Sequence, residues 1–138
     1  MNISFSIPGE VVGKARPRFA RVGGFVRTYT PARTTRYENI VKLMAARAMA
    51  GKTPIDGAVC VSISLHIEPP KSWSKKKRSD ALAGIILPTS KPDIDNCIKS
   101  IFDACNNTVW IDDKQVVDVS VVKRYSAHPC AIVLVRGV

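Results

Sequence analysis

Five of the eleven acidic residues of this 138-residue chain lie in one stretch, KPDIDNCIKSIFDACNNTVWIDD, at residues 91–113. Asp93 and Asp95 stand at the predicted start of a helix, where the positive end of the helix dipole stabilises an anion by about 0.3–1 kcal/mol. Helix capping can therefore account for these two acids. It does not account for Asp112 and Asp113, which come after the helix has ended.

A turn at Asn106 and Asn107 is predicted to fold the chain back, which would bring Asp112 and Asp113 beside the start of the helix. Three or four carboxylates in one place repel one another strongly unless a cation lies among them. Oxygen ligands suit hard divalent ions such as Mg²⁺ or Mn²⁺ and do not suit Zn²⁺. The stretch therefore predicts a magnesium site.

Lys99 shares one polar helix face with Asp95 and Asp103, because the three residues are spaced four apart. Its ammonium could contact a phosphate group or stabilise the charge of a transition state. It could instead form intrahelical ion pairs, worth about 0.2–0.5 kcal/mol each. The spacing alone leaves both roles open.

Positive charge dominates the rest of the chain, and the formal net charge is +10. Residues 1–50 hold nine Lys or Arg against two acids, and residues 75–78 read KKKR. Clustered cations attract polyanions, of which nucleic acid is the commonest in a cell, although a merely solvated basic surface is the alternative. A basic protein with an aspartate-lined magnesium site is most simply a phosphodiesterase that acts on nucleic acid.

The remaining sequence predicts the elements that must position this site. Alternating or apolar patterns predict strands at residues 2–8, 58–68, 108–111, 115–126 and 130–137. Residues 13–31 are predicted to form an extended basic loop or a hairpin that turns at Gly23 and Gly24, with residues 25–29 as its returning arm. Three helices are expected, at residues 31–50 with Thr30 as N-cap, at residues 72–84 with Ser72 or Ser74 as N-cap, and at residues 95–106.

This order predicts a single α+β domain over residues 1–138, with a mixed β-sheet and helices packed on one face. The opposite face of the sheet would then need cover. A homodimer is one ordinary way to supply it.

The string KPDIDNCIKSIFDACNNTVWIDDKQVVDVSVVKRY resembles the signature of the RusA family of Holliday junction resolvases, which runs D-x-D-N-x-x-K, then F-D-A, then W-x-D-D-x-Q-V-V. The upstream segments VGKARPRF and VRTYTPARTTRYE are similar to the N-terminal part of phage-type members. The resemblance implies a homodimeric, magnesium-dependent endonuclease that places symmetric nicks in four-way DNA junctions.

The resemblance also implies roles for single residues. Asp93, Asp95 and Asp113 match the metal-site aspartates of the family, and Lys99 matches its catalytic lysine. Asp112 falls on an acidic position too, with a supporting role at the metal. Because the turn after F-D-A is shorter than in the family pattern, the choice between Asp112 and Asp113 stays open. Further motif positions, expected to orient ligands or support the structure, are Asn96, Asp103 and Gln115.

Basic residues would contact the DNA backbone in such a nuclease and make binding strongly salt-dependent. The expected contacts are Lys14, Arg16, Arg18 and Arg27, then Lys75, Lys76, Lys77 and Arg78, then Lys123 and Arg124. Phe19, Phe25 and Tyr29 lie among the arginines. Insertion of these rings between bases is one possible role, but packing in the core is the expected one.

Several other classes of protein are not supported. No apolar run approaches the roughly 18 residues that cross a membrane, and the N-terminus lacks the features of a secretory signal, so a cytoplasmic protein is expected. The four cysteines lack zinc-site spacing and are expected to be reduced and mostly buried. Neither His66 nor His128 has a partner spaced for metal binding. GKARPR lacks the second glycine of a phosphate-binding loop.

Two alternatives to junction resolution remain. The chain could be a metal-dependent nuclease for other branched or flapped DNA. It could also be a non-catalytic junction-binding protein whose acids hold a structural ion.

Overall fold

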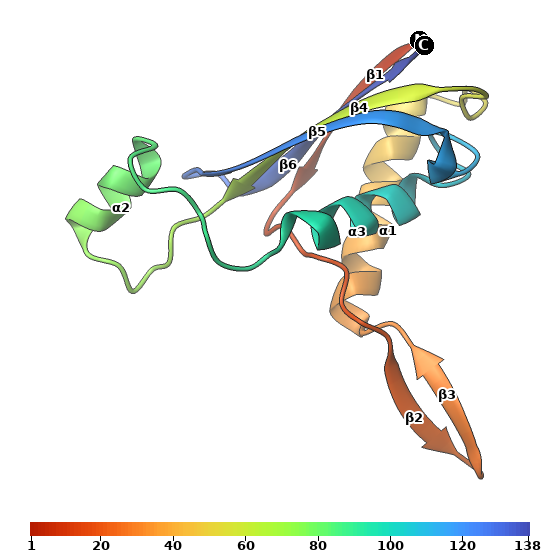
Figure 1. The fold of residues 1–138 in the computed structure, drawn as a ribbon, viewed down its shortest axis with the longest axis horizontal. Coiled ribbons are helices and arrows are strands. Elements are labelled where there is room, and N and C mark those ends of the chain that lie inside the picture. Colours follow the sequence, from red (N-terminus) through yellow and green to blue (C-terminus); the bar gives the residue numbers. More distant parts are fainter.

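The computed structural model describes residues 1–138 and centres on a four-stranded mixed sheet with the order β1-β6-β4-β5 (Figure 1). Its strands are β1 (Asn2–Pro8), β4 (Val59–Ile67), β5 (Val116–Tyr125) and β6 (Cys130–Gly137). Strand β6 is antiparallel to both of its neighbours, whereas β4 and β5 run parallel. The mixed sheet and the α+β class are therefore confirmed.

Alternation explains β1 and β4. Ile3, Phe5 and Ile7 are buried on one face of β1, and Val59, Val61, Ile63 and Leu65 are buried on one face of β4. Because successive side chains of a strand point to opposite faces, these residues all meet the same core. Both strands lie where the sequence predicts them.

Helices α1 (Ala32–Met49) and α3 (Ile94–Cys105) cover one face of this sheet (Figure 1). Helix α1 begins one residue later than predicted, because Pro31 has extended backbone (ψ 142°) and is itself the N-cap, so the prediction of Thr30 was wrong. The helix ends as expected, with Ala50 in the left-handed conformation before Gly51.

Helix α2 (Lys75–Leu82) projects away from the sheet (Figure 1). The prediction that the helices pack on one face of the sheet was therefore wrong for this helix. Its N-cap is Ser74, whose hydroxyl oxygen accepts a hydrogen bond from the Lys77 amide, as one of the two predicted caps. The residues at the start of this helix are held by an aromatic and a cation–π contact: Trp73 packs edge-on against Tyr125, and Lys77 lies over the Trp73 ring.

The segment around Trp110 is not the strand that the sequence predicts. Trp110 is fully buried, but it forms only isolated bridges, to Ile55 and to Asn106. Its indole N–H donates to the Asn106 side chain at 2.7 Å, so a side-chain contact takes the place of sheet pairing. The chain then enters a single turn of 3-10 helix, η1 (Asp113–Gln115).

The face of the sheet opposite α1 and α3 is open, and it carries both small polar and large apolar side chains. Ser4, Ser62 and Ser120 lie on this face in register and are exposed. Small polar side chains tolerate water on one face of a sheet. Leu134, which lies between Ser4 and Ser62, is 50% exposed, and Val122 on the same face is 42% exposed, so this face is only partly polar and its cover by a second copy stays a prediction.

The predicted hairpin is confirmed as a separate two-stranded sheet, β2 (Arg18–Val22) and β3 (Phe25–Tyr29), which turns at Gly23 (φ 55°) and Gly24 (φ 84°). The hairpin extends away from the body of the molecule (Figure 1). Phe19 and Phe25 are 72% and 77% exposed, so the expectation that these rings pack in the core was wrong.

None of the helices combines the length and the apolar character needed to cross a membrane. All four cysteines are free thiols, two of them buried (Cys97 and Cys105) and two partly exposed (Cys60 and Cys130).

Candidate active site

Helix α3 carries most of the candidate site because its two faces differ. Cys97, Ile101 and Cys105 are buried against the core, as the apolar spacing predicts. Asp95, Lys99 and Asp103 are exposed on the opposite face. Burial of the apolar stripe therefore orients the polar residues outward.

The segment that follows β1 is held against α3 by hydrogen bonds. The Lys14 amide donates to the Asn96 carbonyl oxygen at 2.8 Å, and the buried Ser100 hydroxyl donates to the Val12 carbonyl oxygen at 2.9 Å. Gly13 permits this approach, since a Cβ at this position would lie 3.0 Å from the Cβ of Asn96. These contacts bring the residues before the hairpin to the polar face of α3.

A cavity of about 680 Å³ lies between these elements. It combines three acids, three cations and one amide with an apolar floor, and its lining residues are Lys14, Ala15, Arg16, Pro17, Asp95, Asn96, Ile98, Lys99, Phe102, Asp103 and Asp113. Asp95, Lys99 and Asp113 therefore line the same cavity, which is the candidate active site.

Asp113 reaches the cavity from the end of α3 and not from its start. The predicted turn forms, with Asn107 at φ 63°, and the Asn106 amide donates to Oδ2 of Asp113 at 3.4 Å. Asn106 follows the last residue of α3, so the expectation that the aspartate pair lies beside the helix N-terminus was wrong. The hydrogen bond from the Trp110 indole to the Asn106 side chain keeps this turn compact. The chain therefore folds back by less than the length of α3.

Asp112 has a different environment from Asp113. Its carboxylate accepts a hydrogen bond from the Lys114 amide at 2.9 Å, and the Gln115 side chain accepts one from the Asp112 amide in return. Gln115 also donates to the carbonyl oxygens of Ile55 and Gly57. Asp112 therefore caps η1 and does not line the cavity.

Asp93 lines an adjoining cavity of about 270 Å³, which shares Lys14, Ala15 and Asn96 with the candidate site. No three acidic, histidine or cysteine side chains lie close enough together to form a complete metal-binding group. The available donors are nevertheless carboxylate oxygens, which is the ligand type that hard divalent ions prefer. The residues fit such an ion by chemistry, with Asp95 and Asp113 on the same cavity.

Of the charged side chains around the cavity, some form ion pairs and others do not. The Lys14 ammonium forms ion pairs with Glu38 and, at 3.3 Å, with Asp103. Burial alone would lower the pKa of Lys14, but its hydrogen bonds to Glu38 and Asp103 outweigh burial and raise that pKa above its ordinary value. Lys99 forms no ion pair with Asp95 or Asp103, so the intrahelical pairing that the spacing allows is absent.

The thiols beneath this face are uncharged at neutral pH. Burial raises the pKa of Cys97 to about 11 and that of Cys105 to about 12. A thiol in this state is a poor nucleophile and a poor metal ligand. Cys97 and Cys105 therefore belong to the core and add no ligand to the site.

Six of the predicted DNA contacts have partners within the protein. Lys76 pairs with Asp80, Lys77 lies over the Trp73 ring and Arg124 donates to the Lys123 carbonyl oxygen, although all three remain exposed. The other three are only partly exposed. Lys14 is paired as described, Lys123 donates to the carbonyl oxygens of Ser90 and Pro92, and Arg78 donates to those of Pro69 and Pro70. The remaining basic residues of that group are exposed, namely Arg16, Arg18, Arg27 and Lys75.

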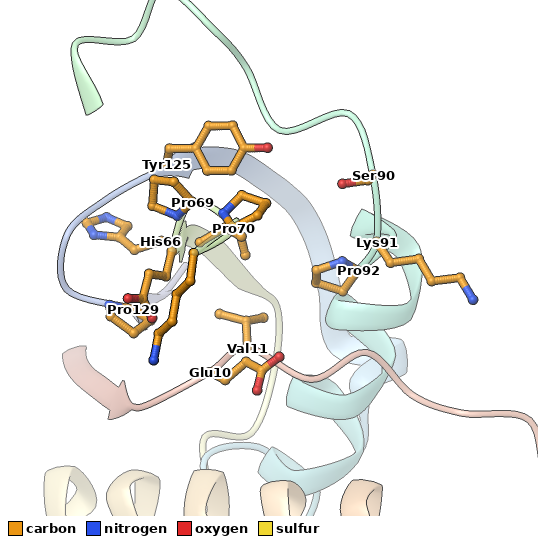
Figure 2. A pocket seen from close by; sticks show the side chains of 13 residues that line it. Glu10, Val11, His66, Pro69, Pro70, Ser90, Lys91, Pro92, Tyr125 and Pro129 are labelled. Atoms are coloured by element: carbon orange, nitrogen blue, oxygen red, sulfur yellow. The ribbon is translucent and has the colours of Figure 1, made fainter. Parts of the chain in front are cut away.

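A further cavity of about 410 Å³ lies between the loop before α3 and the end of β4 (Figure 2). Glu10, Pro69, Pro70 and Tyr125 surround it, and Lys91 points away from it (Figure 2). It contains none of the metal-site aspartates that the sequence predicts. It is therefore separate from the candidate site.

A cavity that joins aspartates to an unpaired lysine and an arginine, on a basic α+β protein, has the make-up of a phosphodiester-cleaving nuclease. The family model described as Endodeoxyribonuclease RusA matches residues 8–136. The chain belongs to the RusA family, and it is accordingly an endodeoxyribonuclease of the Holliday junction resolvase type. It is similar to the uncharacterized protein YqaN of Bacillus subtilis (strain 168), with 38% identity over 138 residues that cover 99% of this chain and 96% of that protein.

Proposed function

We propose that this chain is a magnesium-dependent nuclease that resolves four-way DNA junctions by paired, symmetric nicks, with Mn²⁺ as a possible substitute for Mg²⁺. The supporting observation is the cavity that joins Asp95, Asp113 and Lys99. Two carboxylates beside an unpaired ammonium provide ligands for a cation and a positive contact for a phosphate. Membership of the RusA family gives the reaction class.

The proposed metal ligands are Asp95 and Asp113, with Asp93 from the adjoining cavity and Asp112 in a supporting role. A hard divalent ion held there would polarise the phosphate and activate water for attack. Asp103 is less available as a ligand, because the Lys14 ammonium already lies 3.3 Å from its carboxylate. Asn106 is proposed to orient Asp113 through its side-chain amide.

Lys99 is proposed to contact the scissile phosphate and to stabilise the negative charge that develops on it during attack. Its ammonium forms no ion pair with the acids on the same helix face, so it is free for a substrate oxygen. Arg16, on the facing wall of the cavity, is exposed and can hold a neighbouring phosphate.

The wider DNA surface is proposed to consist of exposed basic residues on the two projecting elements. The hairpin β2–β3 supplies Arg18 and Arg27, and helix α2 supplies Lys75, Lys76 and Lys77. Arg124 lies near the end of β5. Phosphate contacts of this kind fix the position of the substrate without reading its sequence.

Paired cuts require two equivalent sites, and a homodimer is proposed to supply them. Sedimentation at micromolar concentration checks this directly. A chain that remains monomeric when bound to a junction, but still cuts two opposed strands, would contradict the dimer and leave the nuclease chemistry intact.

The function is tested by incubating the protein with a mobile four-way junction, with and without magnesium, and mapping every nick. Symmetric nicks that appear only with the metal are the expected result. The Asp95→Asn variant should bind the junction normally and fail to cut it. Asp118→Asn, which changes an exposed acid on β5 outside the candidate cavity, is the matched control and should cut normally.

Other results would redirect the proposal. Efficient cutting of flaps or forks without symmetric nicks in the junction identifies a nuclease for other branched DNA. Binding without cutting by the unaltered chain, at any divalent ion concentration, identifies a non-catalytic junction-binding protein.

A further inference from the structure

The hairpin β2–β3 exposes large apolar side chains that the rest of the molecule does not cover. Phe25 is 77% exposed, Phe19 is 72% exposed and Val26 is 62% exposed. The two strands pair only with each other and form a sheet of their own. A ribbon of this kind is marginally stable by itself, so exposed rings on it indicate a surface used for binding.

Arginines and rings share both faces of the hairpin. Arg27 lies opposite Ala20 and Phe25 lies opposite Val22 in the register, which places Arg27 and Phe25 on one face. Phe19 and Arg21 lie on the other face, since neighbouring residues of a strand point to opposite sides. Interleaved cations and rings are typical of surfaces that bind unpaired nucleic acid, where bases stack and phosphates pair.

Charge favours a nucleic acid over a second copy of this chain as the occupant. Residues 16–29 contain four arginines and no acid. Two copies that met through their hairpins would bring these like charges together without any counter-charge from the hairpin itself. A polyanion supplies the missing charge with its own phosphates.

The root of the hairpin is fixed at the candidate active site. The Ala15 amide donates to the Thr34 hydroxyl oxygen at 3.3 Å, and the Lys14 amide donates to the carbonyl oxygen of Asn96 on α3. Arg16, next along the chain, lines the candidate cavity. Because the start of the hairpin is fixed in this way, a base bound by the hairpin would have a defined position relative to Asp95 and Lys99.

We propose that the β2–β3 hairpin is a stacking arm for bases whose stacking is interrupted at the branch point of DNA. Phe19 and Phe25 stack on base faces that the crossover leaves without a stacking neighbour, and the neighbouring arginines contact the adjacent phosphates. This inference rests on the proposed function, because it takes branched DNA as the substrate. It adds a way to distinguish a branch point from continuous duplex, in which bases are not accessible to stacking.

The test compares a double variant, Phe19→Leu with Phe25→Leu, with its rescue partner, Phe19→Tyr with Phe25→Tyr. Leucine keeps an apolar side chain but removes the ring, and tyrosine restores the ring. The readouts are the dissociation constants for a four-way junction and for plain duplex, and the fluorescence of 2-aminopurine placed at the branch point. Ile85→Ala, which changes a residue 72% exposed after helix α2, is the matched control.

Loss of base stacking corresponds to roughly 5- to 150-fold weaker binding for each ring that engages a base. The leucine variant should weaken junction binding by at least about fivefold and lose the 2-aminopurine response, with duplex binding unchanged. The tyrosine variant and Ile85→Ala should behave as the unaltered chain. The thermal midpoint should not move in any variant, because these side chains lie outside the core.

The remaining outcomes overturn the inference in distinguishable ways. If the unaltered chain binds and cuts junctions but the leucine variant does so equally well, the stacking arm is wrong and the nuclease function stands. If the leucine variant changes the sedimentation of the protein from dimer to monomer, the rings belong to a contact between copies. If the unaltered chain binds no DNA of any form, the proposed function fails and the stacking arm fails with it.

Discussion

Replacement of Lys14 by methionine tests whether this lysine positions the active site or contacts DNA. Methionine keeps the unbranched stem and removes the charge. In the structure the Lys14 side chain is 22% exposed, and its ammonium lies between Glu38 on α1 and Asp103 on α3. Its removal leaves two carboxylates without a counter-charge at the contact between the two helices.

The expected effect on stability follows from the exposure of the partners. Hydrogen bonds between charged groups contribute about 1.5–3 kcal/mol when partly buried, which describes the pair with Glu38. Asp103 is 41% exposed, so its pair contributes at most about 1 kcal/mol. A loss of about 2 kcal/mol corresponds to a fall in Tm of roughly 7 °C for 138 residues, at about 2.1 cal/mol/K of unfolding entropy per residue.

Thermal unfolding measures this change, and Arg33→Met is the matched control. Arg33 forms an ion pair with Glu10 in which the side chains are 60% and 80% exposed, and such pairs contribute little. The control should shift Tm by less than about 2 °C. The pKa of Lys14 is raised, so the stabilisation is complete below the ordinary pKa of a lysine and is lost as pH rises through the folded value.

The same variant separates the two roles through the salt dependence of junction binding. A lysine that neutralises one phosphate contributes about 0.9 to the slope of log affinity against log salt concentration. We expect Lys14→Met to leave that slope unchanged. An unchanged Tm together with a slope reduced by about 0.9 would refute the positioning role and establish Lys14 as a DNA contact.

Three further predictions follow from neighbouring groups. Asp112→Ala should lower the free energy of unfolding by about 1 kcal/mol in chemical denaturation, because it removes the cap of η1, whereas Asp113→Ala should abolish cutting with little change in stability. The free energy of unfolding should be constant up to about pH 9 and fall as pH rises towards 11 and 12. The reason is that the Cys97 and Cys105 thiols stay protonated in the folded state but ionise at lower pH in the unfolded state. A free energy of unfolding that does not change up to pH 11 would contradict the burial of these thiols. Chelation of divalent ions with EDTA should stop cutting but leave junction binding intact, as measured by gel shift.

The elements that the sequence predicts well are those with a strong local pattern. Strands β1 and β4 follow strict alternation, and the hairpin follows from two glycines between short apolar segments. The buried face of α3 follows from helical spacing. In each case the information is contained within a few neighbouring residues, so no knowledge of distant contacts is needed.

The errors arise where a particular side-chain contact, which periodicity does not reveal, decides the outcome. Trp110 lies in a strand-like sequence, but its hydrogen bond to Asn106 and its burial hold the segment in a compact turn. The sequence predicts Lys123 as a DNA contact, but its ammonium donates to two carbonyl oxygens in the loop before α3. The sequence alone does not distinguish a lysine that donates to backbone carbonyl oxygens from one that is free to contact a phosphate.

The aromatic residues of the hairpin are a second case in which the sequence gives the wrong environment: burial was expected, and the rings are exposed. Phe19 and Phe25 are apolar enough to be expected in the core, and burial would be the commoner outcome. Their exposure depends on the absence of any element that packs against β2 and β3, which no pattern within residues 18–29 reveals.

The five acids of residues 91–113 are close together in the sequence, but in the structure some of them interact with other groups of the protein. Asp103 is paired with Lys14, and Asp112 caps η1. Asp95 and Asp113 remain on the cavity, with Lys99 as a cation that no acid neutralises. A divalent ion at Asp95 and Asp113 would therefore leave Lys99 free for the phosphate, so that separate groups bind the metal and the substrate.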